Sequence, residues 1–266
     1  SVMSNQWEGL RTREAEMELP PGALVSALNI EFFRKGWGTR GGFERLNAVS
    51  AGTDPINGIF DGFNHVLVME GQKLHRYSAG ALTQIATGLT NNAIPSFASY
   101  NALDLFVNGS ASSENPKKWN GSTLADIGGS PPKADFIEVW RSHVWLGGLA
   151  SPNQSQLQRS THENPEEYGA YYNVAKRQKG SSITGMAVCP TGSREDEGVL
   201  VIFSEDMIHH FTGYTRLSFN LTPVNHKIGC ISHRSIVVAE SMTYWVDESG
   251  IFCSGDGGVT YNKISW

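Results

Sequence analysis

The chain has 266 residues and a formal net charge of −5, with 39% hydrophobic residues, 18% charged residues and 29 glycines. This weakly acidic net charge does not indicate binding of nucleic acid through a basic surface. No apolar run approaches the ~18 residues of a membrane helix. A composition rich in glycine, serine, asparagine and aromatics but poor in charge indicates many short strands joined by tight turns.

The N-terminal residues 1–28 show no alternation of polar and apolar side chains. Leu19 is followed by Pro20 and Pro21, which favour an extended chain. We expect a non-β N-terminal arm laid over another protein surface, with a disordered leader as the alternative. Leu19, Pro20 and Pro21 are therefore candidate protein-contact residues. After the arm, residues 29–33 and 38–46 predict two strands of a hairpin with glycine at the turn.

From residue 56 onward the sequence repeats with a period of about 40 residues, a length typical of repeat architectures. Each unit predicts short strands separated by polar or glycine-rich turns. The second strand of each unit is its most apolar, and a continuous apolar run indicates burial on both faces. The predicted units span residues 56–89, 94–128, 134–160, 183–222 and 228–266.

These units predict an all-β fold, a β-propeller of about five or six four-stranded blades that cover one another face to face. A flat sandwich would show cleaner alternation. The sixth blade would come from the hairpin at 29–46 if it joins the ring, so we assign residues 29–266 to the propeller domain. A long polar insertion is expected at 161–182, after the third unit.

The last unit contains Ser254-Gly-Asp256-Gly-Gly-Val-Thr260-Tyr261, which fits the Asp-box pattern of sialidase-like propellers. In this pattern the serine and aspartate side chains bond to the turn backbone, and the glycines supply positive φ. We expect a structural hairpin turn here. The motif also leaves open an alternative function, a carbohydrate-binding or glycan-cleaving propeller.

No motif indicates catalysis or metal binding. His209 and His210 are the only adjacent histidines, and neighbours on a strand point to opposite faces, so a regular strand cannot bring both to one metal. The carboxylates are scattered in turns, and no nucleophile, phosphate-binding or zinc motif is present. We therefore expect no enzymatic activity, no cofactor and no metal.

The three cysteines, Cys189, Cys230 and Cys253, are an odd number without CxxC spacing. We expect them to be small buried hydrophobic residues in strands, outside any disulfide.

Four aromatic residues lie in expected turn or insertion sequence, namely Trp37, Tyr168, Tyr171 and Tyr172. Exposed aromatic clusters mark contacts with proteins or sugars. We count these four as candidate protein-contact residues, with ordinary loop packing as the alternative.

Three stretches carry motifs in a fixed order. Residues 19–32 and 38–43 contain LPPG, then N-hydrophobic-x-F, then R-x-G. Residues 158–168 contain a strand, a serine and then NPE before an aromatic residue. Residues 228–238 contain Ile-Gly-Cys at their start and Ser-Ile-Val-Val at their end, and residues 247–252 are Asp-Glu-Ser-Gly-Ile-Phe. Together they resemble the structural proteins of tailed bacteriophages that are found at the neck or tail.

The resemblance implies a propeller-like β protein that forms oligomers in the virion and performs no catalysis. Its implied partners are other virion proteins, such as portal, adaptor or tail components, and further copies of itself, without nucleic acid or membrane. We expect a rigid disc at the head–tail junction (neck) or tail, assembled in the bacterial host cytoplasm. Its arm and the 161–182 insertion would dock or seal the connector. A cellular interaction scaffold is a third alternative.

Overall fold

The computed structural model describes residues 30–33, 36–39, 52–173, 182–189, 198–213 and 218–265. The chain divides into two compact units, Ser1–Leu46 and Asn47–Trp266. Apart from one 3-10 turn, η3 (His233–Ser235), the regular structure of the described residues is β-strand. In this described part of the chain, no helix has the length and apolar character needed to cross a membrane.

The first unit contains an antiparallel hairpin of β1 (Ile30–Phe33) and β2 (Gly36–Thr39). The second strand begins at Gly36 rather than at residue 38, and Gly36 pairs with Phe33. The hairpin falls in the first unit, so the chain divides after Leu46 and not after residue 28. The predicted arm, residues 1–28, lies outside the described residues.

The described residues of the second unit form five antiparallel four-stranded sheets, blades 1 to 5, each with its strands in chain order. Blade 1 comprises β3 (Ile56–Asp61), β4 (Val66–Glu70), β5 (Lys73–Ser78) and β6 (Ala81–Ala86). Blade 2 comprises β7 (Ser96–Tyr100), β8 (Leu103–Val107), β9 (Lys117–Trp119) and β10 (Leu124–Asp126). Blade 3 comprises β11 (Ala134–Trp140), β12 (His143–Leu149), β13 (Gln156–Thr161) and β14 (Asn164–Asn173).

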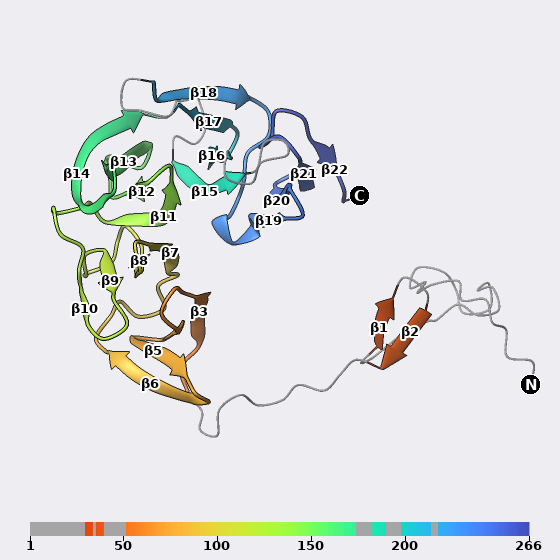
Figure 1. Cartoon of the computed structure of the whole chain (residues 1–266). Helices are drawn as coiled ribbons and strands as arrows, with labels where there is room; N and C mark the ends of the chain where they lie inside the picture. The colour runs from red at the N-terminus through yellow and green to blue at the C-terminus, as the bar shows by residue number, and fades with distance from the viewer. Residues whose placement is uncertain are drawn as a thin grey trace, which may run out of the picture. The chain divides into compact units, whose positions relative to one another are not determined.

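Blade 4 comprises β15 (Ile183–Cys189), β16 (Val199–Ser204), β17 (Ile208–Thr212) and β18 (Asn220–Asn225). Blade 5 comprises β19 (Val237–Ala239), β20 (Met242–Asp247), β21 (Gly250–Ser254) and β22 (Asn262–Lys263). The blades follow one another along an arc, with the first strand of each on the inner side (Figure 1). This is the predicted β-propeller architecture, built from radial sheets stacked face to face.

Three blades turn from their first to their second strand through two residues in the left-handed conformation. The pairs are Asn101-Ala102 in blade 2, Arg141-Ser142 in blade 3 and Glu240-Ser241 in blade 5, with φ between 49° and 64°. Two successive residues with positive φ form a type I′ turn, whose twist matches that of the flanking strands. A break of two residues in the sequence is therefore enough to close each hairpin.

The hydrophobic core lies between the blades. Four buried clusters occur among the described residues, and each joins two neighbouring blades. Between blades 3 and 4, for example, Trp145 packs on Phe211 with ring centroids 4.5 Å apart. No described cluster joins blade 5 to blade 1. In the described chain, therefore, apolar packing holds the arc together through neighbouring blades alone.

Burial of the second strands follows from this stacking. β12 is buried along its whole length, because blades 2 and 4 cover blade 3 on its two sides. β20 instead alternates, with Thr243, Trp245 and Asp247 buried and the residues between them half-buried. The predicted burial on both faces is confirmed for β4, β8, β12 and β16. It is wrong for β20, because Met242, Tyr244 and Val246, on the side turned away from blade 4, are only half-buried.

β14 corrects the predicted insertion at 161–182. Residues 164–173 form the fourth and outermost strand of blade 3, paired with β13 through a bulge near Ser160. The strand is polar because an outermost strand meets solvent along one edge and part of its faces. The polar sequence of residues 164–173 therefore does not indicate the strand that they form.

Candidate functional site

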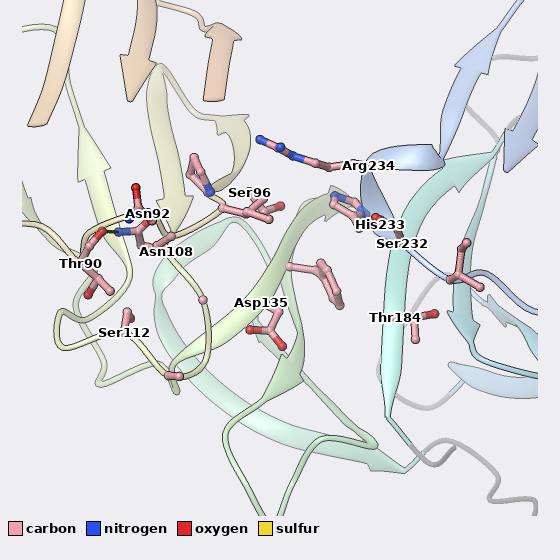
Figure 2. Close-up of a pocket in the computed structure, with 17 residues that line it drawn as sticks. Thr90, Asn92, Ser96, Asn108, Ser112, Asp135, Thr184, Ser232, His233 and Arg234 are labelled. Atoms are coloured by element: carbon pink, nitrogen blue, oxygen red, sulfur yellow. Dashed lines mark hydrogen bonds between the residues drawn. The ribbon is translucent and has the colours of Figure 1, made fainter. Parts of the chain in front are cut away.

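A cavity of about 590 Å³ lies in the second unit where the chain enters the inner strands of blades 2 to 5. Residues within the segments 90–96, 108–112, 135–136 and 231–234 line it, together with Thr184 (Figure 2). These segments lead into β7, β11, β15 and β19 or follow β8, so blade stacking brings them together.

One wall is organised by the Glu114 carboxylate. The Thr90 hydroxyl donates to Glu114 Oε2 at 2.6 Å, and the Asn108 amide nitrogen donates to Oε1 at 2.5 Å. Burial acts to raise the pKa of Glu114, but the hydrogen bonds from Thr90 and Asn108 outweigh it and lower the pKa to about 2. The ionised Glu114 thus fixes the Asn108 amide with its nitrogen toward the carboxylate. Asn108 Oδ1 is left buried without a hydrogen-bond partner.

Asp135 lies at the start of β11 and also lines the cavity. Its Oδ1 accepts a hydrogen bond from the Ser110 backbone N–H at 2.7 Å. Lys133 Nζ donates to the carbonyl oxygens of Ser112 and Ser113 at 2.6 and 2.9 Å. These bonds hold the loop after β8 against the entry to β11. Among the described residues that line the cavity, Asp135 is the only one with a carboxylate.

The opposite wall comes from β15 and from the chain before β19. Thr184 Oγ1 and His233 Nδ1 have no hydrogen-bond partner. The His233 ring packs on Phe136 at 4.8 Å, and burial lowers the pKa of His233, so its imidazole is neutral at pH 7. The Arg234 guanidinium donates to the carbonyl oxygen of Asn57 in β3. Figure 2 shows Thr184, His233 and Arg234 on the side opposite the loop after β8.

The sequence patterns do not predict this cavity. Asn108, Asp135, Thr184 and His233 lie far apart along the chain, and each stands at or beside the end of a strand. Polar residues at strand ends are common in any β protein. Predicting that these four residues lie around one cavity would have required knowing how the blades are arranged in space.

The second feature is a set of exposed apolar side chains on the outward faces of the two terminal blades. The end face of blade 5 is defined by Val237, Met242, Tyr244, Val246 and Ile251, which share one side of the sheet in the register of β19, β20 and β21. Val237 is 52% exposed and Ile251 is 43% exposed. The other side of the same strands packs on blade 4.

The end face of blade 1 is defined by Ile56 and Ile59, on the side turned away from blade 2. Val68, Glu70 and His75 lie on the same side of the sheet but are buried. Ile59 is 65% exposed and Ile56 is 57% exposed. Glu70 and His75 are buried, with Oε2 and Nε2 3.0 Å apart. Both ends of the arc therefore present large apolar side chains to solvent.

Of the predicted contact residues, Leu19, Pro20 and Pro21 lie outside the described residues. Trp37 lies in β2, in register with Phe32, and not in a turn.

The three tyrosines divide between core and surface. Tyr172 packs on Trp145 and Phe211, and its hydroxyl accepts a hydrogen bond from Arg159 Nε at 3.1 Å. Tyr168 packs on the core between blades 2 and 3, and burial raises the pKa of its hydroxyl. Both therefore lie inside the blade stack rather than on the expected exposed loop. Tyr171, 52% exposed, stays a contact candidate.

The Asp-box is a turn device, as predicted. Ser254 Oγ donates to Asp256 Oδ1 and accepts from the Gly258 N–H, both at 2.7 Å. The Thr260 N–H donates to Asp256 Oδ1 at 2.9 Å. Ser254 and Asp256 are thus occupied in shaping the hairpin between β21 and β22.

His209 and His210 are buried in β17. His210 Nε2 lies 2.9 Å from the Gly257 carbonyl oxygen, and burial lowers the pKa of His209 to about 4. The three cysteines are buried and free, as predicted. Within the described residues, no group of three or more His, Cys, Asp or Glu side chains could hold a metal ion.

No protein-family model matches the sequence, and no curated protein matches it. Several solved structures are similar in fold. One is PorZ, a bacterial surface component of the type-IX secretion system of Porphyromonas gingivalis. It has 13% identity and a TM-score of 0.51, and the match covers 78% of this chain and 33% of that one.

Another is the extracellular domain of a putative hybrid two component system from B. thetaiotaomicron, with 8% identity, a TM-score of 0.56 and coverage of 84% and 29%. A third is YCF48 bound to D1 peptide, with 12% identity, a TM-score of 0.51 and coverage of 86% and 71%. The chain thus spans about a third of the first two structures. At such low identities these likenesses show the fold alone, which is a β-propeller.

Proposed function

We propose that the protein is a non-enzymatic structural protein of a tailed bacteriophage virion, at the head–tail junction or in the tail. The three sequence stretches that resemble neck and tail proteins support this placement. The structural observation that carries the assembly role is the pair of apolar end faces, because large exposed apolar patches mark interaction surfaces.

The end faces resemble the faces that are covered inside the arc. Each internal pair of blades buries apolar side chains between two sheets, whereas Ile59 and Ile251 are left exposed at the two ends. Fully burying an isoleucine side chain contributes about 1.5–3 kcal/mol. A neighbouring copy of the chain, or another virion protein, would gain this stabilisation by covering them.

The cavity supports a role without hydrolysis. Glycosidases use two carboxyl groups that flank the scissile bond, about 5–10 Å apart. Among the described lining residues Asp135 alone offers a carboxylate, and the Asp256 carboxylate is bonded within its own turn. This arrangement favours binding over glycan cleavage.

Placing a charge on the end faces is expected to weaken assembly. Ile251→Asp in blade 5 and Ile59→Asp in blade 1 should each raise the dissociation constant of self-association at least about tenfold, because a carboxylate would be desolvated in the contact. Sedimentation velocity of the full chain over a concentration series measures this constant.

Ala125→Asp serves as the control, since Ala125 is exposed on the outermost strand of blade 2, away from either end face. It should leave association unchanged. A chain that stays monomeric throughout the series, or an equal loss in all three variants, would contradict assembly through the end faces.

Deletion of residues 1–28 is expected to abolish incorporation into phage particles while the second unit keeps its fold. The reason is the proposed docking of the arm on a neighbouring virion protein. Particle composition measures incorporation, and circular dichroism checks the fold. A variant with a glycine-serine segment of equal length in place of 1–28 separates contact from mere length. Normal incorporation of the deletion variant would refute the arm proposal.

A further inference from the structure

We propose that Asn120 is a site of spontaneous covalent modification, where the side-chain amide is lost and aspartate and isoaspartate form. The Asn120-Gly121 pair lies in the turn between β9 and β10, the two outer strands of blade 2. This inference is independent of virion assembly. It rests on the chemistry of the pair, on its exposure and on the hydrogen bonds to the Asn120 amide oxygen.

The reaction needs only the chain itself and water. The Gly121 backbone nitrogen, after losing its proton to hydroxide, attacks Asn120 Cγ, and a carbon–nitrogen bond forms. The bond between Cγ and Nδ2 breaks, and Nδ2 takes a proton from water and leaves as ammonia. Water then adds to either carbonyl of the five-membered succinimide, which yields aspartate or isoaspartate. Glycine hinders the attack least, because it has no Cβ beside its nitrogen.

The sequence contains three Asn-Gly pairs, which begin at Asn57, Asn108 and Asn120. Asn108 is 4% exposed, and its amide nitrogen donates to Glu114 Oε1 at 2.5 Å. Asn57 lies within β3 and is half-buried. Asn120 is exposed and lies outside the strands. The first two pairs must therefore open locally before they can react, whereas Asn120 is accessible in the folded chain.

The amide oxygen of Asn120 accepts three hydrogen bonds within the turn. The Ser122 N–H and hydroxyl each donate to Oδ1 at 3.0 Å, and the Thr123 N–H donates at 2.8 Å. When the Gly121 nitrogen attacks, negative charge develops on this oxygen. Donors at these distances stabilise such a charge, as in an oxyanion hole. Asn108 Oδ1, in contrast, has no hydrogen-bond partner.

The turn also touches blade 1, so its modification alters a contact between two blades. Arg76 Nη1 in β5 donates to the Gly121 carbonyl oxygen at 3.5 Å. A Cβ built on Gly121 would lie 3.1 Å from Asn64 Oδ1. Isoaspartate inserts a methylene into the main chain, which moves Gly121 relative to Arg76. Either product also adds a negative charge to the outer side of blade 2.

Peptide mapping of the full chain, incubated at mildly alkaline pH and then digested in mildly acidic buffer, tests the proposal. Trypsin cleaves after Lys118 and Lys133, and the peptide between them contains Asn120 as its single asparagine. Asn120 should convert at least about tenfold faster than the asparagines of the other two Asn-Gly pairs, because those react only after local opening. An unincubated sample gives the background.

Three controls separate the contributions. Asn153 is exposed but precedes Gln154, so it should convert at least about tenfold more slowly than Asn120. Asn120→Gln keeps the amide on a longer side chain and should leave the peptide unmodified. Ser122→Ala removes the hydroxyl donor and should slow the conversion about threefold. In denaturant, the three Asn-Gly pairs should convert at similar rates.

Three results would overturn the proposal. The first is an Asn120 that stays unmodified or converts no faster than Asn153. The second is equal conversion of all three Asn-Gly pairs in the folded chain. The third is a preference for Asn120 that persists in denaturant, since local sequence rather than the folded turn would then cause it. The readout is the composition of one peptide, not self-association, so failure here and failure of the assembly proposal are distinguishable.

Discussion

Replacing Trp145 with alanine is expected to lower the free energy of unfolding by about 3–5 kcal/mol, because it removes a large side chain from a packed core. Trp145 is 0% exposed and lies in the interface between blades 3 and 4. Its ring contacts Trp140, Tyr172 and Phe211 at centroid distances of 5.9, 5.8 and 4.5 Å. Its indole N–H donates to the Trp140 carbonyl oxygen at 3.1 Å.

Chemical denaturation of the full chain measures this loss. Tyr171→Ala is the control, since Tyr171 is an aromatic residue of blade 3 that is half-exposed. Its effect should stay within about 0.5 kcal/mol. If Trp145→Ala were as stable as Tyr171→Ala, the interface between blades 3 and 4 would not hold the arc together.

Glu138 is expected to make the protein less stable as the pH rises. It lies on β11, and burial raises the pKa of its carboxyl from 4.5 to about 8, against a smaller opposing effect of the Val139 N–H. A carboxyl with a raised pKa in the folded state contributes its full stability below 4.5, the unfolded value. That stability is lost as the pH rises through about 8. Above this range Glu138 is ionised in both states and its contribution no longer changes.

Glu138→Gln removes the ionisation and keeps the shape of the side chain. At pH 8.5 it should therefore raise the free energy of unfolding by about 2–5 kcal/mol, and below pH 4.5 it should change little. Denaturation curves across this pH range measure the difference. Glu248→Gln, at an exposed position, is the control and should retain the pH dependence of the unmodified chain. Parallel pH profiles for Glu138→Gln and the unmodified chain would refute the prediction.

The sequence predicts most of the fold because the repeat is expressed in the inner strands. Apolar runs such as Val66–Glu70 and Val199–Ser204 are covered on both sides, so they stand out against polar turns. The outermost strands carry a weaker signal. Asn164–Asn173 meets solvent and has a bulge in its pairing with β13, so neither alternation nor a continuous apolar run marks it.

The same bulge explains why the tyrosines are not predicted correctly as a group. Tyr171 pairs with Gln158, and Tyr172 pairs with Leu157 and faces Trp145. Tyr168 pairs with Ser160 beyond the register shift and faces the core between blades 2 and 3. A shift by one residue exchanges the two sides of a strand, and local sequence does not show where it occurs. The cavity is harder still to predict, because its walls come from strand ends of different blades.

The linear order of the blade contacts has a consequence for how the domain opens. When each unit touches only its neighbours, stability is approximately a sum of unit and nearest-neighbour contributions. Among the described blades, blades 2, 3 and 4 each share apolar clusters with two neighbouring blades. Blades 1 and 5 share a cluster with one neighbour each. Fraying therefore begins at the termini of the array and moves inward. A partner that covers an end face gives the terminal blade a second neighbour. Assembly would therefore stabilise the terminal blades against local unfolding, which couples assembly to cooperative folding.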